Sequence, residues 1–459
     1  MPDSSSSPPK FTPRVPFRDA FRFWVLLGWI NFGGPTGQIA LMHQELVERR
    51  RWISNARFLH ALNYCMLLPG PEAMQLATYV GWLLHRTAGG IVAGVFFVLP
   101  AFFVLLGLSW LYAVGGAIPW VSAIFYGLRA AVIAIVAAAV LRIAARALGN
   151  PIMVTIAAAS FVAIFLFKVP FPAIVISAGV LGLIGARLWP LAFSAAAAHG
   201  AGPSDTLSET GVAISDDAPP AEHTRPTVRR ALTTLAVCLT VWWVPLGGVI
   251  VWRGRDDVLS QLAVFFSKAA LVTFGGAYAV LAYVAQAAVE QYAWLRPGEM
   301  LVGLGLAEST PGPLIMVTEF VGFLAAFRHP ADLDPLLAGA LGAAVTTWAT
   351  FAPSFLFILV GAPYIERLRR NVLLSGALSA ITAAVVGVIL NLAVWLGLHT
   401  LFQVVEMPVL GGVVPVPRLG TVDLPALAIG LVAFVGMWRW KWSIVPVVVG
   451  SGIAGWLLR

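Results

Sequence analysis

The chain has 459 residues, of which 59% are hydrophobic and only 11% are charged, and its mean hydropathy is +0.87. An ordinary soluble domain carries roughly 25% charged residues, so this composition excludes a soluble globular protein and predicts an integral membrane protein. The net charge of +8 does not indicate nucleic-acid binding, because the basic residues fall in short loops between apolar runs. Both cysteines, Cys65 and Cys238, lie inside apolar runs, which gives no sign of a disulfide framework or a thiolate metal site.

The N-terminal residues 1–19 begin as a serine- and proline-rich tail without the apolar core of a signal peptide, so we expect disorder there. Thirteen apolar runs follow, each a candidate to cross roughly 30 Å of hydrocarbon. A polar segment at 194–230 separates the sixth run from the seventh and is expected to be a linker. The runs are 20–43, 58–84, 89–112, 120–147, 151–167, 171–190, 231–252, 260–286, 299–326, 335–362, 372–398, 422–438 and 441–458.

One stretch of the sequence occurs twice. Adding 242 to each residue number carries Phe32-Gly33-Gly34 onto Phe274-Gly275-Gly276 and Pro69-Gly70-Pro71 onto Pro311-Gly312-Pro313 without a gap. Between positions 32 and 74 the two copies agree at 14 of 43 places. This agreement indicates a duplication rather than shared apolar composition.

The duplication divides the chain into two repeats, 20–193 and 254–459, with the linker and an additional helix at 231–253 between them. Seven runs separate the two starts, an odd number, so the copies are expected to face opposite sides of the membrane. The expected fold is an all-α integral membrane protein of about 13 transmembrane helices in two inverted repeats with interrupted helices. The alternative is that duplication only built a larger helical bundle.

Loop charges favour an N-terminus on the cytoplasmic side, because most clusters of arginine and lysine then lie inside. One loop disagrees: Arg49, Arg50 and Arg51 would lie outside, where the rule expects few cations. We therefore treat these three arginines as candidates for substrate binding, since a guanidinium donates two parallel hydrogen bonds to an oxyanion.

The glycine- and proline-containing breaks predict an anion site. A break inside an apolar segment frees backbone groups, which is tolerated where neighbours or a water-filled cavity satisfy them. A helix that restarts at Pro35 or Pro71 presents free N–H groups and the positive end of its dipole. A plain kink is the alternative for one such motif, but four breaks in register favour a site between the halves.

Carboxylates near these breaks are candidates for proton coupling, because a buried carboxyl group can load and unload a proton as access alternates. Glu72 and Glu308 each lie within three residues of a Pro-Gly-Pro break. Glu48 and Glu290 are duplicated, and each is followed four residues later by a tryptophan. The alternative for this second pair is an interfacial helix with a tryptophan anchor.

The breaks, the Glu48-to-Trp52 segment, the run Leu68-Pro69-Gly70-Pro71-Glu72-Ala73-Met74-Gln75 and the segment Glu308-Ser309-Thr310-Pro311-Gly312-Pro313 together resemble the chromate ion transporter family in its long, two-domain form. The resemblance covers most of residues 20–190 and 260–400. It implies chromate efflux through a multi-pass protein of the bacterial inner (plasma) membrane, conferring resistance, with sulfate as the similar oxyanion. One departure is Ala277, where the first copy has Pro35.

No zinc-protease, serine-hydrolase or nucleotide-binding motif is found, so we expect no enzyme, no cofactor, no metal and an ion gradient as the driving force, with chromate exchanged against protons. A sulfate transporter or a passive oxyanion pore is the alternative, and a homodimer in the lipid bilayer is left open. The expected substrate-binding residues are Asn31, Phe32, Gly33, Gly34, Pro35, Arg49, Arg50, Arg51, Pro69, Gly70, Pro71, Gln75, Phe274, Gly275, Gly276, Ser309, Thr310, Pro311, Gly312 and Pro313, and the expected coupling residues are Glu72, Glu308, Glu48 and Glu290.

Overall fold

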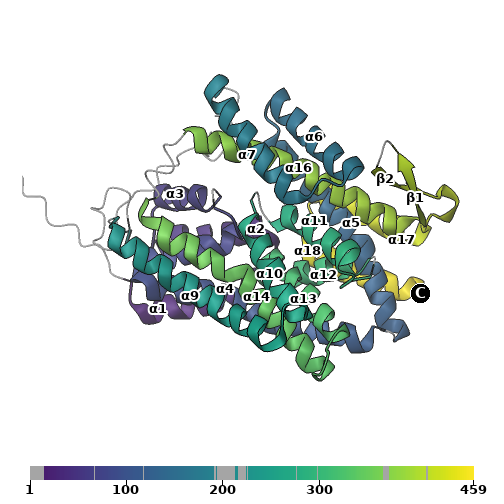
Figure 1. Ribbon diagram of the computed structural model, residues 1–459, viewed down its shortest axis with the longest axis horizontal. Coiled ribbons are helices and arrows are strands. Elements are labelled where there is room, and N and C mark those ends of the chain that lie inside the picture. The colour runs from purple at the N-terminus through teal and green to yellow at the C-terminus, as the bar shows by residue number, and fades with distance from the viewer. Residues whose placement is uncertain are drawn as a thin grey trace, which may run out of the picture.

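The chain folds into a bundle of helices of very different lengths (Figure 1). This computed structural model describes residues 15–66, 68–116, 118–190, 193, 212–214, 224, 226–274, 277–296, 298–364, 372–409 and 412–459. Most of the expected tail and linker therefore lies outside the described residues. The principal elements are α1 (Phe17–Ile30), α2 (Gly34–His43), η1 (Gln44–Arg49), α3 (Asn55–Cys65), α4 (Glu72–Gly115), α5 (Pro119–Ala147), α6 (Pro151–Phe167), α7 (Phe171–Leu188), α9 (Val228–Arg253), α10 (Val258–Leu271), α11 (Ala277–Gln286), η4 (Ala287–Gln291), α12 (Glu299–Ser309), η5 (Leu314–Met316), α13 (Val317–Arg328), α14 (Pro335–Gly361), η6 (Ala362–Tyr364), α16 (Val372–Leu401), η7 (Leu419–Thr421), α17 (Leu424–Arg439) and α18 (Ile444–Leu458).

Six helices of the described part are long and apolar enough to cross a membrane, and large apolar side chains such as Phe103, Ile176 and Val251 lie exposed on the outside of the bundle. A water-soluble protein rarely exposes so much apolar surface, so the molecule is a multi-pass membrane protein. Four of the thirteen expected runs are divided at the breaks into helices of 10 to 14 residues, or into a short helix that leads into α4. At about 1.5 Å per residue, such helices are too short to cross the hydrocarbon core.

The long helix α4 is two antiparallel helices. His85 and Arg86 have non-helical backbone angles, with φ −137° and +55°. Gly81 packs on the backbone of Gly89, and a Cβ on Gly94 would lie 2.5 Å from the Thr78 hydroxyl oxygen. The segment before His85 therefore returns from the centre of the molecule, and only residues 87–115 continue across it.

The first pair of short helices also forms a hairpin. α1 ends at Ile30 and, after the break, α2 and η1 run back beside it, because Arg50 stacks 4.8 Å over the ring of Phe23 in α1. Trp52 contacts the same ring at 5.2 Å. The chain thus enters the bundle and leaves it at the same end.

The second repeat builds the same hairpin in matching register. Trp294 contacts Phe265 at 5.5 Å and 80°, as Trp52 contacts Phe23 at 5.2 Å and 79°. In both copies a short π-helix, η1 or η4, precedes the turn. The residue before each tryptophan, Arg51 or Ala293, has a left-handed backbone with φ +54° or +52°. The sequence repeat is therefore also a repeat of structure.

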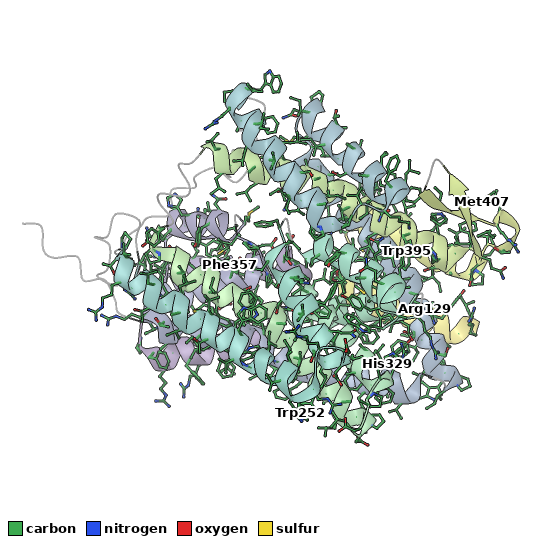
Figure 2. The ribbon with its side chains drawn as sticks, in the orientation of Figure 1. Arg129, Trp252, His329, Phe357, Trp395 and Met407 are labelled. Atoms are coloured by element: carbon green, nitrogen blue, oxygen red, sulfur yellow. The ribbon has the colours of Figure 1, made fainter. Side chains whose placement is uncertain are left out.

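The hairpins of the two repeats begin and end at different ends of the bundle. The first end carries Val15, Arg51–Ser54 and the turn at His85. The His85 imidazole bonds the Val15 carbonyl, and the Ser54 N–H donates to the Ile214 carbonyl of the linker. The second end carries Glu299, Arg328 and the Arg253–Asp332 ion pair. Residues 87–115 connect the two ends, because Tyr112 donates to Glu299 at the far end. Figure 2 places Trp252 and His329 at the second end and Phe357 toward the first.

One element departs from the expected all-α fold. Strands β1 (Val404–Val409) and β2 (Gly412–Pro417) form an antiparallel hairpin between α16 and α17. The segment is rich in valine, which favours strands. It lies outside every apolar run that the sequence indicated, so the hydropathy pattern alone could not identify it.

Candidate functional site at the helix breaks

The breaks of the two repeats meet at the centre of the molecule and bond each other. Gly70 N–H donates to the Thr273 carbonyl at 2.8 Å, and Gly312 N–H donates to the Asn31 carbonyl at 3.4 Å. Because Thr273 and Gly312 occupy the positions of Asn31 and Gly70 in the second copy, the two bonds are equivalent. The Pro-Gly-Pro segment of each repeat thus satisfies a carbonyl freed by the opening break of the other.

Both Pro-Gly-Pro segments are closely packed. Gly70 and Gly312 have φ +126° and +108°, values that favour glycine. A Cβ on Gly70 would lie 2.7 Å from the Ser354 hydroxyl oxygen, and a Cβ on Gly312 would lie 2.4 Å from Ala101. Proline and glycine at these positions therefore hold the hairpin tips against the long helices.

Two glutamines reinforce this junction from the first repeat. Gln38 Nε2 donates to the carbonyls of Asn31 and Gly312 at 2.9 and 2.6 Å. Gln75 Nε2 donates to the Pro69 carbonyl at 2.7 Å. Asn31 itself donates to the Phe97 carbonyl at 3.3 Å. Gln38 and Gln75 thus bond backbone carbonyls at the breaks, and Asn31 connects the opening break to α4.

The start of α2 is the open part of this centre. Phe32 is 40% exposed, and Gly33, Gly34 and Pro35 are half-buried, in contrast to the buried Pro-Gly-Pro segments. Gly33 and Gly34 have φ +91° and +67°. The first N–H groups of a helix have no carbonyl partner within it, so the amides of Gly33, Gly34 and Thr36 form the positive end of α2. The matching Gly275 and Gly276 lie outside the described residues.

A buried carboxylate faces this helix start. Glu308, near the end of α12, is only 3% exposed, and a Cβ on Gly34 would lie 3.9 Å from its Oε2. The Tyr278 hydroxyl of α11 donates to Glu308 Oε1. The other oxygen, Oε2, is buried and has no hydrogen-bond partner among the described residues. The site therefore combines a positive helix end with a carboxylate from the other repeat.

Sequence reasoning missed Tyr278, and the duplication could not suggest it, because the matching residue of the first copy is Thr36. Tyr278 lies 30 residues from Glu308 along the chain and four residues after Phe274 of the second break. Nothing in the spacing connects the two. Their contact exists because the hairpins bring α11 beside the end of α12.

The neighbouring polar residues of the second repeat bond their own helix. Ser309 Oγ donates to the Leu306 carbonyl at 2.9 Å, and Thr310 Oγ1 donates to the Ala307 carbonyl at 3.2 Å. Both hydroxyls thereby satisfy carbonyls at the last turn of α12. Phe274 is half-buried directly before Gly275, and Pro311 and Pro313 are buried beside Gly312.

The arginines Arg49, Arg50 and Arg51 lie at the first end, away from the breaks. Arg49 and Arg50 both bond Glu45, at 2.7 and 3.3 Å. The carbonyl of Arg51 accepts from Ala213 of the linker at 3.1 Å. Arg49 ends η1 and the other two follow it, so about 20 Å of helix separates them from Gly34. The structure therefore does not bring these three residues together with the other expected substrate contacts.

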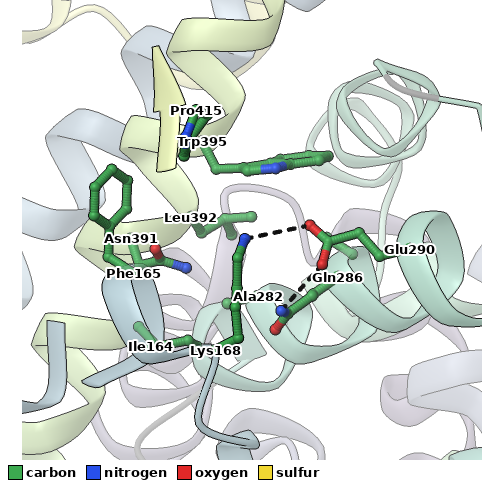
Figure 3. A pocket seen from close by; sticks show the side chains of 11 residues that line it. Ile164, Phe165, Lys168, Ala282, Gln286, Glu290, Asn391, Leu392, Trp395 and Pro415 are labelled. Carbon is green, nitrogen blue, oxygen red and sulfur yellow. Dashed lines mark hydrogen bonds and ion pairs between the residues drawn. The ribbon is translucent and has the colours of Figure 1, made fainter. Parts of the chain in front are cut away.

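The other three expected coupling carboxylates have different surroundings. Glu72 is the first residue of α4, where a carboxylate compensates the positive helix end. Glu48 lies 3.2 Å from His43 Nδ1 and is half-exposed. Figure 3 shows Glu290 at a small pocket, 3.9 Å from Lys168 Nζ and 3.2 Å from Gln286, beside Asn391 and Trp395. Of the four expected coupling residues, Glu308 alone has been found facing the start of α2.

The chain is similar to known transport proteins. The profile of a family described as "Chromate transporter" matches residues 18–183 and 260–456. The "Chromate transport protein" of Pseudomonas aeruginosa is 32% identical over 97% of this chain and 93% of its own length. The protein of the same description from Cupriavidus metallidurans is 28% identical over 99% and 96%. The "Probable chromate transport protein" of Synechococcus elongatus is 27% identical over 96% of both chains. No solved structure matches the chain significantly.

Proposed function

Since this chain belongs to the chromate transporter family, we propose that it exports chromate across the inner membrane, using an ion gradient, and thereby confers chromate resistance. The observation that carries this proposal is the half-exposed start of α2, which offers free amides in the middle of a membrane protein. Helix N-termini are natural sites for oxyanions. The nearby carboxylate of Glu308 supplies a group that can exchange protons.

The fold supports an inverted-repeat transporter. The helices of the first repeat's hairpins begin and end at the first end, and those of the second repeat's hairpins at the second end, while the breaks at their tips lie in the centre. Residues 87–115, α5, α6, α7 and α9 then provide five crossings between the hairpins of the first repeat and those of the second, an odd number. In many secondary transporters such paired interrupted helices enclose the substrate near the midplane.

This topology removes the conflict in the loop charges. With hairpins in place of full spans, Arg49, Arg50 and Arg51 lie at the same end as the N-terminal residues, His85–Arg86 and the start of α9. All of these cations then face the cytoplasm, as the positive-inside rule requires. At the second end, Arg253 and Arg328 are paired with Asp332 and Glu299. The arginine cluster would attract oxyanions to the cytoplasmic opening rather than hold them at the centre.

Within this site we assign different tasks to the expected residues. The amides of Gly33, Gly34 and Thr36 hold the oxyanion, while the Pro-Gly-Pro segments and Gln75 hold the surrounding backbone. By the repeat, Gly275 and Gly276 would supply a second helix start. Glu308 is the first candidate for coupling, and Glu72, Glu48 and Glu290 have structural partners or positions that explain them.

Sulfate or a related oxyanion is the alternative substrate, because backbone amides recognise charge and tetrahedral shape rather than the central atom. The test is uptake of labelled chromate into everted membrane vesicles with and without a proton gradient, and with excess sulfate. The proposal predicts gradient-dependent uptake of chromate that excess sulfate reduces by competing for the same amides. Uptake of sulfate in preference to chromate would favour the alternative, and no uptake of either would refute both.

A further inference from the structure

The carboxylate of Glu308 and a bound oxyanion would use the same electrostatic partners. Among the described residues, the titratable or charged groups that act on Glu308 are Tyr278 of α11 and Arg142 of α5. Tyr278 donates a hydrogen bond to Oε1, whereas Arg142 acts only through its charge. The third partner is the start of α2, toward which the unpartnered Oε2 points.

A charged carboxylate without a partner for one oxygen is costly inside a membrane protein. The positive end of α2 reduces that cost for as long as no other anion occupies it. A dianion at the same helix start would place two negative groups side by side in a medium of low dielectric constant, where like charges repel strongly. Either the carboxylate takes up a proton or the dianion leaves.

From this geometry we infer that the Glu308 carboxylate competes with the oxyanion for the start of α2. A proton therefore binds to Glu308 when an oxyanion binds at α2, and both are released together. The inference rests on the proposed function and adds the direction in which the proton moves relative to the oxyanion. The proton comes from water when the oxyanion enters the site and returns to water when the oxyanion leaves. No bond to the oxyanion forms or breaks.

Movement of the proton and the oxyanion in the same direction differs from the exchange of chromate against protons that the sequence led us to expect. A proton and a dianion that move together carry a net charge of −1 out of the cell. An inside-negative membrane potential drives that movement. The membrane potential, rather than the pH difference, would then drive efflux.

The test is equilibrium binding of selenate to the purified full-length protein in detergent across a range of pH. Selenate is suitable because, unlike chromate, it stays a dianion throughout the range in which carboxylic acids titrate. Linkage is reciprocal, so protonation of Glu308 should strengthen selenate binding. At pH values above the titration midpoint of Glu308, the affinity of the wild-type protein for selenate should rise about tenfold for each unit by which the pH is lowered. In a weakly buffered solution, adding selenate should also make the medium more alkaline, by about one proton per anion bound.

Glu308→Gln should bind selenate tightly at every pH and take up no proton. Glu319→Gln is the matched control, because Glu319 of α13 is also buried and neither of its carboxylate oxygens has a hydrogen-bond partner in the part of the chain that the structure describes. It should keep the wild-type slope and proton uptake. If Glu308→Gln does not fold, Glu308→Asp serves instead, because its shorter carboxylate should withdraw from α2 and make the slope shallower.

Three results would overturn the inference: a wild-type affinity that does not change with pH, a Glu308→Gln variant that keeps the slope, or a Glu319→Gln variant that loses it. A different failure identifies the proposed function as wrong. In that case the wild-type protein binds neither chromate, sulfate nor selenate at any pH.

Discussion

The two repeats share their framework and differ in the chemistry at their centres. Trp52 and Trp294 pack on equivalent phenylalanines, and the Pro-Gly-Pro segments bond equivalent carbonyls. The central polar residues have no such match. Met66 and Thr36 occupy the positions of Glu308 and Tyr278. Duplication therefore supplied a symmetric scaffold, and later substitutions made its centre one-sided.

The glutamines show the same asymmetry in the opposite direction. Gln38 and Gln75 of the first repeat correspond to Val280 and Val317 of the second. Both glutamines bond backbone at the junction, so the first repeat contributes polar side chains that fix the structure. The second repeat contributes the group that can change its charge. Equivalent substitutions in the two halves should therefore have unequal effects.

The largest effect is expected at the start of α2. Gly34→Val places a branched side chain where φ is +67° and where Glu308 Oε2 lies close by, so it should abolish chromate transport. Gly107→Val is the control, because no atom lies within 4 Å of a Cβ at that position. Vesicle flux and the amount of inserted protein should be measured for both. Normal flux in Gly34→Val would remove the α2 start from the site.

The Pro-Gly-Pro glycines are less informative targets. Gly70→Leu should also abolish transport, but its side chain would collide with Gln75 and Ser354. Loss of activity should therefore be accompanied by a lower melting temperature of the detergent-solubilised protein. A Gly70→Leu protein of wild-type stability without transport would instead indicate that this amide contacts the substrate.

The next effect separates the two carboxylates at the breaks. Glu308→Gln should remove the part of the pH dependence of flux that comes from loading a proton at the site, and leave only the part that comes from the protonation of chromate itself. Glu72→Gln should keep that dependence and lose only the favourable interaction with the start of α4, about 0.3–1 kcal/mol. Flux in vesicles at several pH values is the measurement. An identical pH profile in both variants would contradict the assignment of proton loading to Glu308 of the second repeat alone.

A smaller effect is expected from the arginine cluster at the first end. Replacing Arg49, Arg50 and Arg51 by lysine keeps the charge, so the KM for chromate should change less than about threefold. Replacing all three by glutamine should raise the KM more at low than at high ionic strength, because salt screens exposed charges. A large loss in the lysine variant would mean that a guanidinium holds the oxyanion directly.

The smallest effect concerns the second end. Arg253 bonds Asp332 in the loop before α14 and holds the pKa of that carboxyl below its ordinary value of 3.8. A lowered pKa stabilises the folded state at pH values above the ordinary pKa of the group. This stabilisation is lost as the pH falls through the lowered pKa. Asp332→Asn should therefore slightly lower the melting temperature at neutral pH and make no difference in strong acid. An equal decrease at both pH values would exclude the ion pair as its cause.

The sequence predicted the elements of the site better than their arrangement. The duplicated motifs identified the breaks, and the Pro-Gly-Pro signature indicated the family that the profile match confirmed. Hydropathy could not distinguish a spanning helix from a hairpin of two short helices, because both present a continuous apolar run. Because of that ambiguity the predicted topology separated Arg49–Arg51 from the start of α1, whereas the structure places both at the same end of the bundle. The partnership of Tyr278 with Glu308 depends on tertiary packing, which no local pattern encodes.

The central claim is that the oxyanion binds at the start of α2, opposite Glu308. Anomalous diffraction from crystals grown with selenate at acidic pH tests it directly, because selenium marks the position of the anion. We expect the selenium peak within hydrogen-bond reach of the amides of Gly34 and Thr36, and we expect Glu308→Gln crystals to show it at alkaline pH as well. A peak at the Pro-Gly-Pro segments or beside Arg49–Arg51, with none at α2, would contradict the account.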